Sequence, residues 1–280
     1  MAKMLAALFR HPSGRIGLVI IGLYLLAAIL ATLGLTPHDP LKLFAIDRLK
    51  PPSATYWFGT DLLGRDAFSR LMLGIRQSMF IAFASVAIAT IAGTIIGLLA
   101  AWWGGLWDGL FMRIMDVLLA FPAILLALLI IAVVGPGAMT SIAAIAIVYT
   151  PIFARVVRGP ALSLKQREFV DAARTFGSSQ TYVLTHHLLL NLVAPLAVQV
   201  TLALAWALLT EAGLSFLGLG TQPPTPSLGL MLAESRNLMQ HAPWLMIFPA
   251  LTIMLGILGF NLTGDALRDI LDPRTQGRQP

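Results

Sequence analysis

Six apolar runs, each near the roughly 20 residues that cross a bilayer, alternate with polar intervals along the chain. The runs lie at about 16–35, 78–101, 110–134, 139–157, 194–214 and 245–262. The first run is longer than the apolar region of a signal peptide, so we expect a retained span. The pattern predicts an all-α, polytopic membrane protein with six transmembrane helices.

The composition excludes a soluble domain. The chain has 280 residues, of which 58% are hydrophobic and 11% charged, whereas soluble domains carry roughly 25% charged residues. The absence of cysteine excludes a disulfide framework and a thiolate metal site. The net charge of +6 is not read as nucleic-acid binding, because most Lys and Arg adjoin apolar runs, where they act as orientation signals.

Counting cations beside the spans predicts that both termini lie in the cytoplasm. With that orientation, the inside set is Lys3, Arg10, Arg15, Arg113, Arg155, Arg158, Lys165, Arg167, Arg174, Arg268, Arg274 and Arg278. The outside set is Lys42, Arg48, Lys50, Arg65, Arg70, Arg76 and Arg236, mostly in the long first outer segment. We expect that segment to be turn-rich and to end in a short amphipathic helix at the membrane face.

Residues 163–191 form the longest polar interval in the later part of the chain. Ser163 and Gln166 have the spacing of a capping box that would start a helix. One stripe of that helix is apolar, at Phe169, Ala172, Ala173 and Phe176. Gly177 can stop the helix in the left-handed conformation, and Ser178 or Ser179 can cap a second helix. Such a helix suits docking outside the membrane, or lying on the lipid surface.

Residues 163–191 resemble a known sequence motif. Asp171-Ala172-Ala173, three more residues and Gly177, then His187-Leu188-Leu189-Leu190-Asn191, are similar to the EAA loop of ABC importer permeases. Asp171 stands where that family usually has Glu, and Leu190 stands where it usually has Pro. The resemblance implies a cytoplasmic coupling helix that fits a groove on an ATPase subunit, so residues 163–191 are called the coupling loop below. The residues it assigns to ATPase coupling are Glu168, Asp171, Ala172, Ala173, Arg174, Phe176 and Gly177.

Three other stretches resemble the second permease subunit of dipeptide, oligopeptide and nickel importers. Residues 57–70 resemble its FGTD-x-x-GRD-x-x-SR signature, residues 211–226 its E-x-x-LSFLGLG-x-x-PPTP run, and residues 260–274 its C-terminal pattern. The resemblance thus runs from about residue 56 to 274 and implies the type I ABC importer permease fold. It also implies these partners: a second homologous permease, two cytoplasmic ATPase subunits and an extracytoplasmic solute-binding protein.

Several local features inside the spans carry further expectations. Gly93-x-x-x-Gly97 indicates close helix packing within the subunit. Arg113 and Asp116 have the spacing of a local ion pair. A tight cytoplasmic turn with interfacial aromatic anchors is expected at Trp102, Trp103, Gly104, Gly105 and Trp107.

Glu211 and Ser215 are the candidates for the transport pathway. Glu211 is the only acid in the latter half of a span, and intramembrane acids are functional suspects. We expect it to lie near the outer surface, where water reaches it, either lining a cavity mouth or contacting substrate.

The sequence holds no motif for catalysis. No Gly is followed by Lys, so no P-loop can form, and no zinc-protease or nucleophile-elbow motif occurs. His186 and His187 are adjacent and make a poor metal pair. We therefore expect no enzyme and no cofactor or metal in this chain, with ATP and Mg bound by partner ATPase subunits.

We expect the chain to lie in the bacterial cytoplasmic membrane and to consist of four parts. Residues 1–35 hold the N-terminus and first span, 36–76 the outer segment, 77–265 the permease domain, and 266–280 a cytoplasmic tail. The expected cargo is a di- or oligopeptide, with glutathione or a nickel chelate as alternatives; spans without His or Cys disfavour a nickel path. An ion-coupled secondary transporter is the rival class, and a membrane scaffold without transport is a third.

Overall fold

The computed structural model describes residues 7–271. The orientation signals Lys3, Arg274 and Arg278 lie outside these residues, as does the end of the C-terminal pattern. Within residues 7–271 the chain is almost entirely helical and forms no β-strand. The long helices are α2 (Pro12–Thr32), α3 (Ala67–Trp103), α4 (Gly105–Leu119), α5 (Ala123–Val134), α6 (Ala138–Lys165), α9 (Leu190–Phe216) and α11 (Trp244–Leu271). The short elements are η1 (Ala45–Asp47), α7 (Glu168–Thr175), α8 (Gln180–Tyr182), the π-helical η2 (Val183–Leu189), α10 (Leu228–Ser235) and η3 (Arg236–Leu238).

The predicted third span is a broken one. Helices α4 and α5 meet at an angle of 91°, so the span expected over 110–134 is sharply bent and not one straight helix. The break falls at Phe121-Pro122, because proline lacks an N–H and disfavours helical geometry in the residue before it. Five other stretches of the described chain are each long and apolar enough to cross a membrane, and the bent pair makes a sixth.

The bent pair as a whole passes from one end of the molecule to the other. Lys165, the last residue of α6, donates to the carbonyl of Ala101 near the end of α3 at 3.1 Å, so these two helices end together. The start of α6 lies at the opposite end, where the N–H of Gly137 donates to the carbonyl of Leu219 beyond α9 at 3.3 Å. With the five other candidate spans, the described residues therefore hold six candidate crossings, the number that the hydrophobic pattern predicts.

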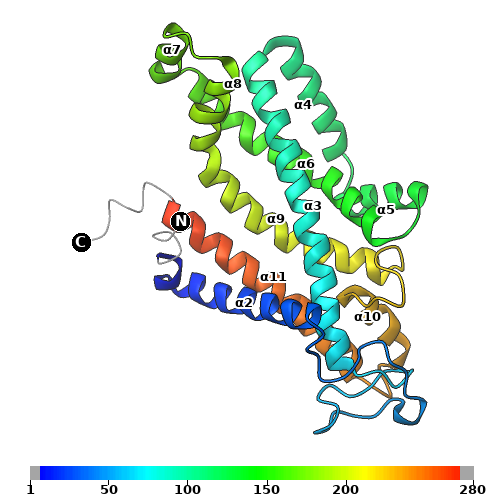
Figure 1. Cartoon of the computed structure of the whole chain (residues 1–280). Helices are drawn as coiled ribbons and strands as arrows, with labels where there is room; N and C mark the ends of the chain where they lie inside the picture. Colours follow the sequence, from blue (N-terminus) through cyan, green and yellow to red (C-terminus); the bar gives the residue numbers. More distant parts are fainter. Residues whose placement is uncertain (1–6, 272–280) are drawn as a thin grey trace.

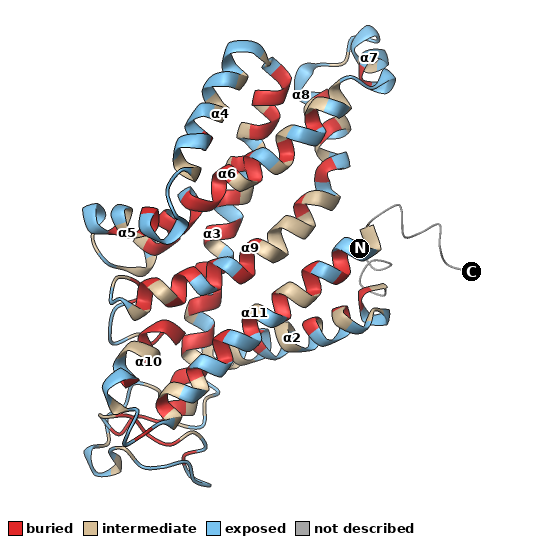
Figure 2. Cartoon of the chain, turned by 180° about the vertical axis from the view of Figure 1, so that it is seen from behind, coloured by how far each residue is buried: buried red, intermediate tan, exposed pale blue. Residues whose placement is uncertain are grey.

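Helices α3, α6 and α9 form the buried centre, and α2 pairs with α11 beside them (Figures 1 and 2). Gly93 and Gly97 let α3 approach α6 closely: a Cβ on Gly93 would lie 2.6 Å from the carbonyl oxygen of Thr150. A Cβ on Gly97 would lie 2.5 Å from the carbonyl oxygen of Ala154. The predicted packing within the subunit is confirmed.

The two ends of the described chain lie at the same end of the bundle. Near the start of α2, His11 Nε2 lies 3.6 Å from the Asp269 carboxylate near the end of α11. Gly14 also lies close to Ala266 of α11. An even number of crossings places both of these helix ends on the side of the coupling loop.

The first outer segment does not end in a separate amphipathic helix, so that expectation was wrong. Helix α3 begins at Ala67, where the carboxylate of Asp66 accepts from the N–H of Ser69 at 3.0 Å, and it continues without a break to Trp103. Its first three turns are mostly buried, because α10 packs against the helix and Leu245 of α11 clusters with Ala67. The charged signature here faces protein, and not the lipid surface.

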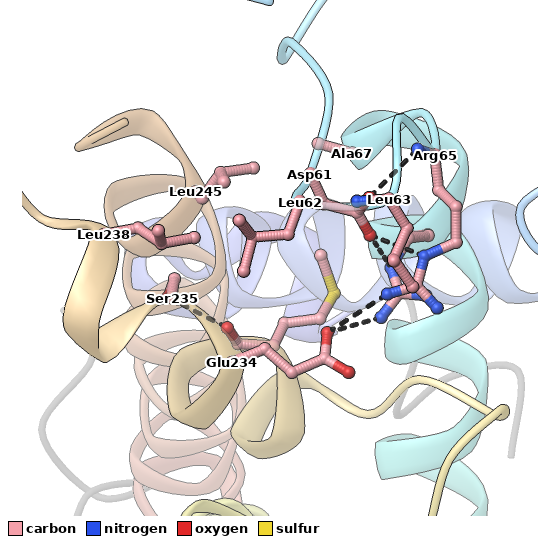
Figure 3. A pocket seen from close by; sticks show the side chains of 11 residues that line it. Asp61, Leu62, Leu63, Arg65, Ala67, Glu234, Ser235, Leu238 and Leu245 are labelled. Atoms are coloured by element: carbon pink, nitrogen blue, oxygen red, sulfur yellow. Dashed lines mark hydrogen bonds and ion pairs between the residues drawn. The ribbon is translucent and has the colours of Figure 1, made fainter. Parts of the chain in front are cut away.

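A network of ion pairs holds the outer end of α3 against α10 (Figure 3). The Asp61 carboxylate lies 2.6 Å from Arg65 Nε and 3.4 Å from Arg70 Nε. Arg70 is 1% exposed and donates through Nη2 to Glu234 at 2.7 Å. These four residues line one side of a cavity of about 360 Å³ whose other walls are mainly leucines. The network joins α3 to α10, and the sequence did not indicate Glu234 as the partner.

Ion pairing also explains why the outer segment carries so many cations. Arg65 and Arg70 are neutralised by the network, and Lys50 pairs with Asp47. Hydrogen bonds from Lys50 and Tyr56 lower the pKa of the Asp47 carboxyl below its usual value.

Candidate functional site

The coupling loop projects beyond the bundle at the end opposite to α10 (Figure 1). Its helix α7 begins at Glu168, with Arg167 as the N-cap residue. Ser163 instead lies inside α6, so the predicted capping box with Gln166 was wrong. Helix α6 runs on to Lys165 because its last turns still pack against the core, with Ala161 fully buried.

The end of α7 has the predicted geometry. Gly177 has φ +79°, its N–H donates to the carbonyl of Arg174 at 2.9 Å, and the N–H of Ser178 donates to that of Ala173 at 3.0 Å. These two bonds define a Schellman stop. Ser179 then caps the next helix by accepting from the N–H of Tyr182 at 3.3 Å. The predicted left-handed glycine and second cap are confirmed.

Helix α7 turns its predicted apolar stripe toward the outside. Phe176 is 88% exposed and Phe169 is 41% exposed, whereas Val170, which the stripe did not include, is fully buried. Val170 therefore fastens α7 to the body of the protein. The remaining predicted contact residues, Glu168, Asp171 and Ala172, are exposed, and Ala173 is half-buried. Their contact with a partner stays a prediction.

Four side chains connect the coupling loop to the inner end of α3. The Arg174 guanidinium lies over the ring of Trp102, 4.4 Å from its centroid, and the indole N–H donates to Gln180 Oε1 at 3.3 Å. The Lys165 ammonium donates to the carbonyl oxygens of Ala101 and Trp102. Trp102 is 8% exposed, so the expectation that it anchors the chain in the lipid interface was wrong. Trp103 and Trp107 are about half exposed, at 50% and 55%, as interfacial anchors should be.

The second helix of the coupling loop continues directly into the fifth span. Helix α8, the π-helical turn η2 and α9 form one helix over Gln180–Phe216, longer than the predicted span at 194–214. No break occurs at Leu190, where the resembling family has proline. Within this segment His186 stacks on Tyr182, and the ring of His187 meets Tyr182 edge-on. Among residues 7–271, no three His, Asp or Glu side chains stand together as a metal site would require.

Glu211 and Ser215 lie in the interior of the subunit. Both are fully buried, so the expectation that water reaches Glu211 was wrong. The Ser215 hydroxyl donates to Glu211 Oε1 at 2.7 Å and accepts from the N–H of Thr221 at 3.2 Å. The chain after α9 folds back over them, and Leu228 at the start of α10 donates its N–H to the hydroxyl of Ser78 at 3.2 Å. Their contact with substrate stays a prediction.

Replacing Glu211 by Gln should leave both stability and transport nearly unchanged. Gln keeps an oxygen that accepts from Ser215 and removes the need to bury a charge. Glu211→Leu should destabilise the subunit by about 1–3 kcal/mol, because it leaves the Ser215 hydroxyl without its acceptor. Thermal unfolding in detergent and uptake assays measure the two effects. A loss of uptake of about tenfold in a stably folded Glu211→Gln variant would assign the carboxylate to the pathway.

The acids near the bent span pair with arginines of α6. Asp116 lies 2.5 Å from Arg155, and not beside Arg113 as its spacing predicts. Asp108 receives two hydrogen bonds of 2.5 Å from Arg158. Tertiary packing of α4 against α6 provides these better partners. Both acids are thus neutralised within the subunit.

The chain is similar to known transport proteins along most of its length. The sequence model of the family described as "Binding-protein-dependent transport system inner membrane component" matches residues 93–277. A dipeptide transport system permease protein of Alkalihalophilus pseudofirmus is 47% identical, over 92% of this chain and 85% of its own. A probable D,D-dipeptide transport system permease protein of Escherichia coli is 42% identical, over 99% and 93%. A glutathione transport system permease protein of Pectobacterium atrosepticum is 45% identical, over 86% and 80%.

A solved structure has a similar fold. The inward-facing MetNI methionine ABC transporter aligns with a TM-score of 0.59 at 17% identity. The alignment covers 72% of this chain and 96% of the solved chain. At this identity the likeness concerns the fold alone.

Proposed function

The chain belongs to the family of binding-protein-dependent transport system inner membrane components, and we propose that it moves di- or oligopeptides across the bacterial cytoplasmic membrane as one permease subunit of an ATP-driven importer. Two cytoplasmic ATPase subunits, a second homologous permease and an extracytoplasmic binding protein complete the assembly in this proposal. Both termini lie in the cytoplasm. ATP and Mg are bound by the ATPases, and this chain performs no catalysis.

The observation that carries the proposal is the exposed face of α7. A short helix with Phe169 and Phe176 exposed, held by a glycine stop beyond the end of the bundle, has the form of a docking element. Large aromatic side chains are the usual anchors at the centre of protein interfaces. Buried Val170 and the Trp102 contacts hold the other face, so α7 is presented rigidly to a partner.

Movement of α7 by the ATPases would switch the pathway between inward-facing and outward-facing states. Helix α7 is connected by two short turns to α6 and α9, two of the central helices. A push on α7 therefore reaches the middle of the bundle without crossing a long flexible linker. Closing of the ATPase pair on ATP would bring the coupling helices of the two permeases together, and hydrolysis would reset them.

The relatives support a peptide as the cargo. Two of the relatives described above are named for dipeptides and one for glutathione, which is itself a peptide. Glutathione is therefore the second candidate. A nickel chelate is the third candidate. The rival of an ion-coupled transporter needs free acids in the spans, whereas Asp108, Asp116 and Glu211 all have partners in this subunit.

Replacing Asp171 by Lys should remove most of the ATPase from the purified assembly. Asp171 is exposed on α7, and its contact with Arg174 at 3.9 Å is too long and too exposed to stabilise the helix appreciably. Burying the carboxylate in an interface requires a donor on the ATPase, and a lysine there would face that donor with like charge. Asp171→Glu is the matched control and should retain the ATPase. The measurement is the amount of ATPase that co-purifies from membranes holding equal amounts of each variant.

Uptake in a deletion strain tests the cargo. Cells complemented with the parent chain should take up labelled dipeptide, and cells with Asp171→Lys should not. Labelled glutathione and labelled nickel chelate are measured in the same strains. Uptake of nickel without uptake of either peptide would overturn the proposed cargo, and ATPase retained by Asp171→Lys would overturn the proposed docking residue.

A further inference from the structure

Trp102 is the side chain on which the contacts between α3 and the coupling loop converge. It occupies the second-last position of α3, and its indole ring is almost completely buried. Arg174, in the last turn of α7, covers the ring, and Gln180, the first residue of α8, receives its N–H. The two ends of the turn that contains Gly177 are therefore both held by one side chain of α3.

Lys165 completes this attachment from the third side. Its ammonium donates to two carbonyls in the last turn of α3 and lies 5.8 Å from the centre of the Trp102 ring. A cation at a helix C-terminus is favourable because the last carbonyls have no partners within the helix. Lys165 is also the last residue of α6. The end of α6, both ends of the Gly177 turn and the end of α3 are thus joined by direct side-chain contacts.

Helix α3 leads from this attachment to the outer face. It has 37 residues and no proline, so it is a single rod of about 55 Å. At its outer end, Arg70 is buried and joined to Glu234 of α10, and Asp66 caps the helix beneath the outer segment. Helix α3 therefore connects the attachment at Trp102 with α10 and with the cavity beside Arg70.

We propose that Trp102 is the positioning residue that couples the motion of α7 to α3, so that ATPase-driven displacement of the coupling helix reaches the outer face through that helix. The inference rests on the proposed function, because it assumes that a partner moves α7. It adds a second route to the chain connections through α6 and α9. In this proposal Trp102 acts by holding Arg174 and Gln180.

The test compares Trp102→Leu and Trp102→Phe with Trp103→Leu in the reconstituted transporter. Trp102→Phe keeps a ring beneath Arg174 but loses the hydrogen bond to Gln180, whereas Trp102→Leu loses both. Trp103 is the neighbouring residue, is 50% exposed, and contacts Trp107 and Phe111 in place of the coupling loop. The readout is the amount of peptide transported for each ATP hydrolysed. Unfolded protein contributes to neither quantity, so a loss of stability alone does not change this ratio.

Loss of a cation–π contact and a hydrogen bond predicts a fall of at least about fivefold in transport per ATP for Trp102→Leu. Trp102→Phe should recover part of this loss, and Trp103→Leu should stay within about twofold of the parent, as for surface substitutions generally. An unchanged ratio in Trp102→Leu, or an equal fall in Trp103→Leu, would overturn the proposal.

A distance measurement on the isolated subunit decides whether Trp102 fastens α7. The chain has no cysteine, so Thr175→Cys on α7 and Leu106→Cys, at a site 92% exposed beside the end of α3, can be spin-labelled selectively. The distribution of distances between the labels should be narrow in the parent chain and in the Trp103→Leu variant. It should be broad in the Trp102→Leu variant. Equal widths in all three would overturn the fastening. This result does not depend on transport, so a failure of the parent to import peptide would refute the proposed function alone.

Discussion

Gly177→Val is expected to uncouple ATP hydrolysis from transport almost completely while leaving the subunit inserted in the membrane. A left-handed conformation costs an L-residue about 1–2 kcal/mol, and a β-branched residue is more strongly disfavoured. The Schellman bonds to Arg174 and Ala173 would be lost as well. Together these effects amount to about 3 kcal/mol, which lowers the population of the docking geometry roughly hundredfold. The measurement is peptide-stimulated ATP hydrolysis and uptake by the reconstituted complex.

The matched control is Gly177→Asn. Asparagine tolerates the left-handed conformation, and no heavy atom lies within 4 Å of the position that a Cβ would take. The side chain therefore fits, and any difference between Asn and Val reports backbone conformation. Equal coupling in the Val variant and the parent would show that the angle between α7 and the following helix does not matter for transport.

Arg70→Gln is expected to destabilise the subunit by about 3 kcal/mol, the lower end of the range for breaking a buried ion pair. Glu234 would keep only Arg65, whose Nη2 lies 3.6 Å away, and the buried Asp61 would lose one of its two cations. The melting temperature in detergent should fall by about 6 °C or more. Because Arg70 joins α3 to α10, the outer segment should also become accessible to protease before the spans do.

Arg76→Gln provides the comparison on the same helix. Arg76 is exposed, so its replacement should change stability by less than about 0.5 kcal/mol. The double variant Arg70→Gln with Glu234→Gln should be more stable than the sum of the single effects predicts, since it leaves no unpaired charge on either side. Additive effects, or a small effect of Arg70→Gln, would mean that the network does not hold the outer end together.

Local features of the chain were predictable because their causes lie within a few residues. The apolar runs indicated six crossings, since a bilayer requires a fixed length of apolar helix. Gly177 and Ser179 were placed correctly as stop and cap because those conformations depend on the residue and its immediate neighbours. The capping box at Ser163 failed because packing of Ala161 and its neighbours against the core carried α6 beyond it.

The sequence by itself determined a six-span, all-α membrane protein, the position of the short helix α7, and the family of the chain. Only the tertiary structure decided which side chains hold that framework together. Arg70 and Glu234 are 164 residues apart and Trp102 and Gln180 are 78 apart, so no local pattern could connect them. Glu211 is buried because the chain after α9 folds back over it. The hydropathy of a segment does not indicate such a tertiary contact. Crossing a membrane depends on the length and polarity of each segment alone, whereas ion pairs, burial and attachment depend on which segments meet.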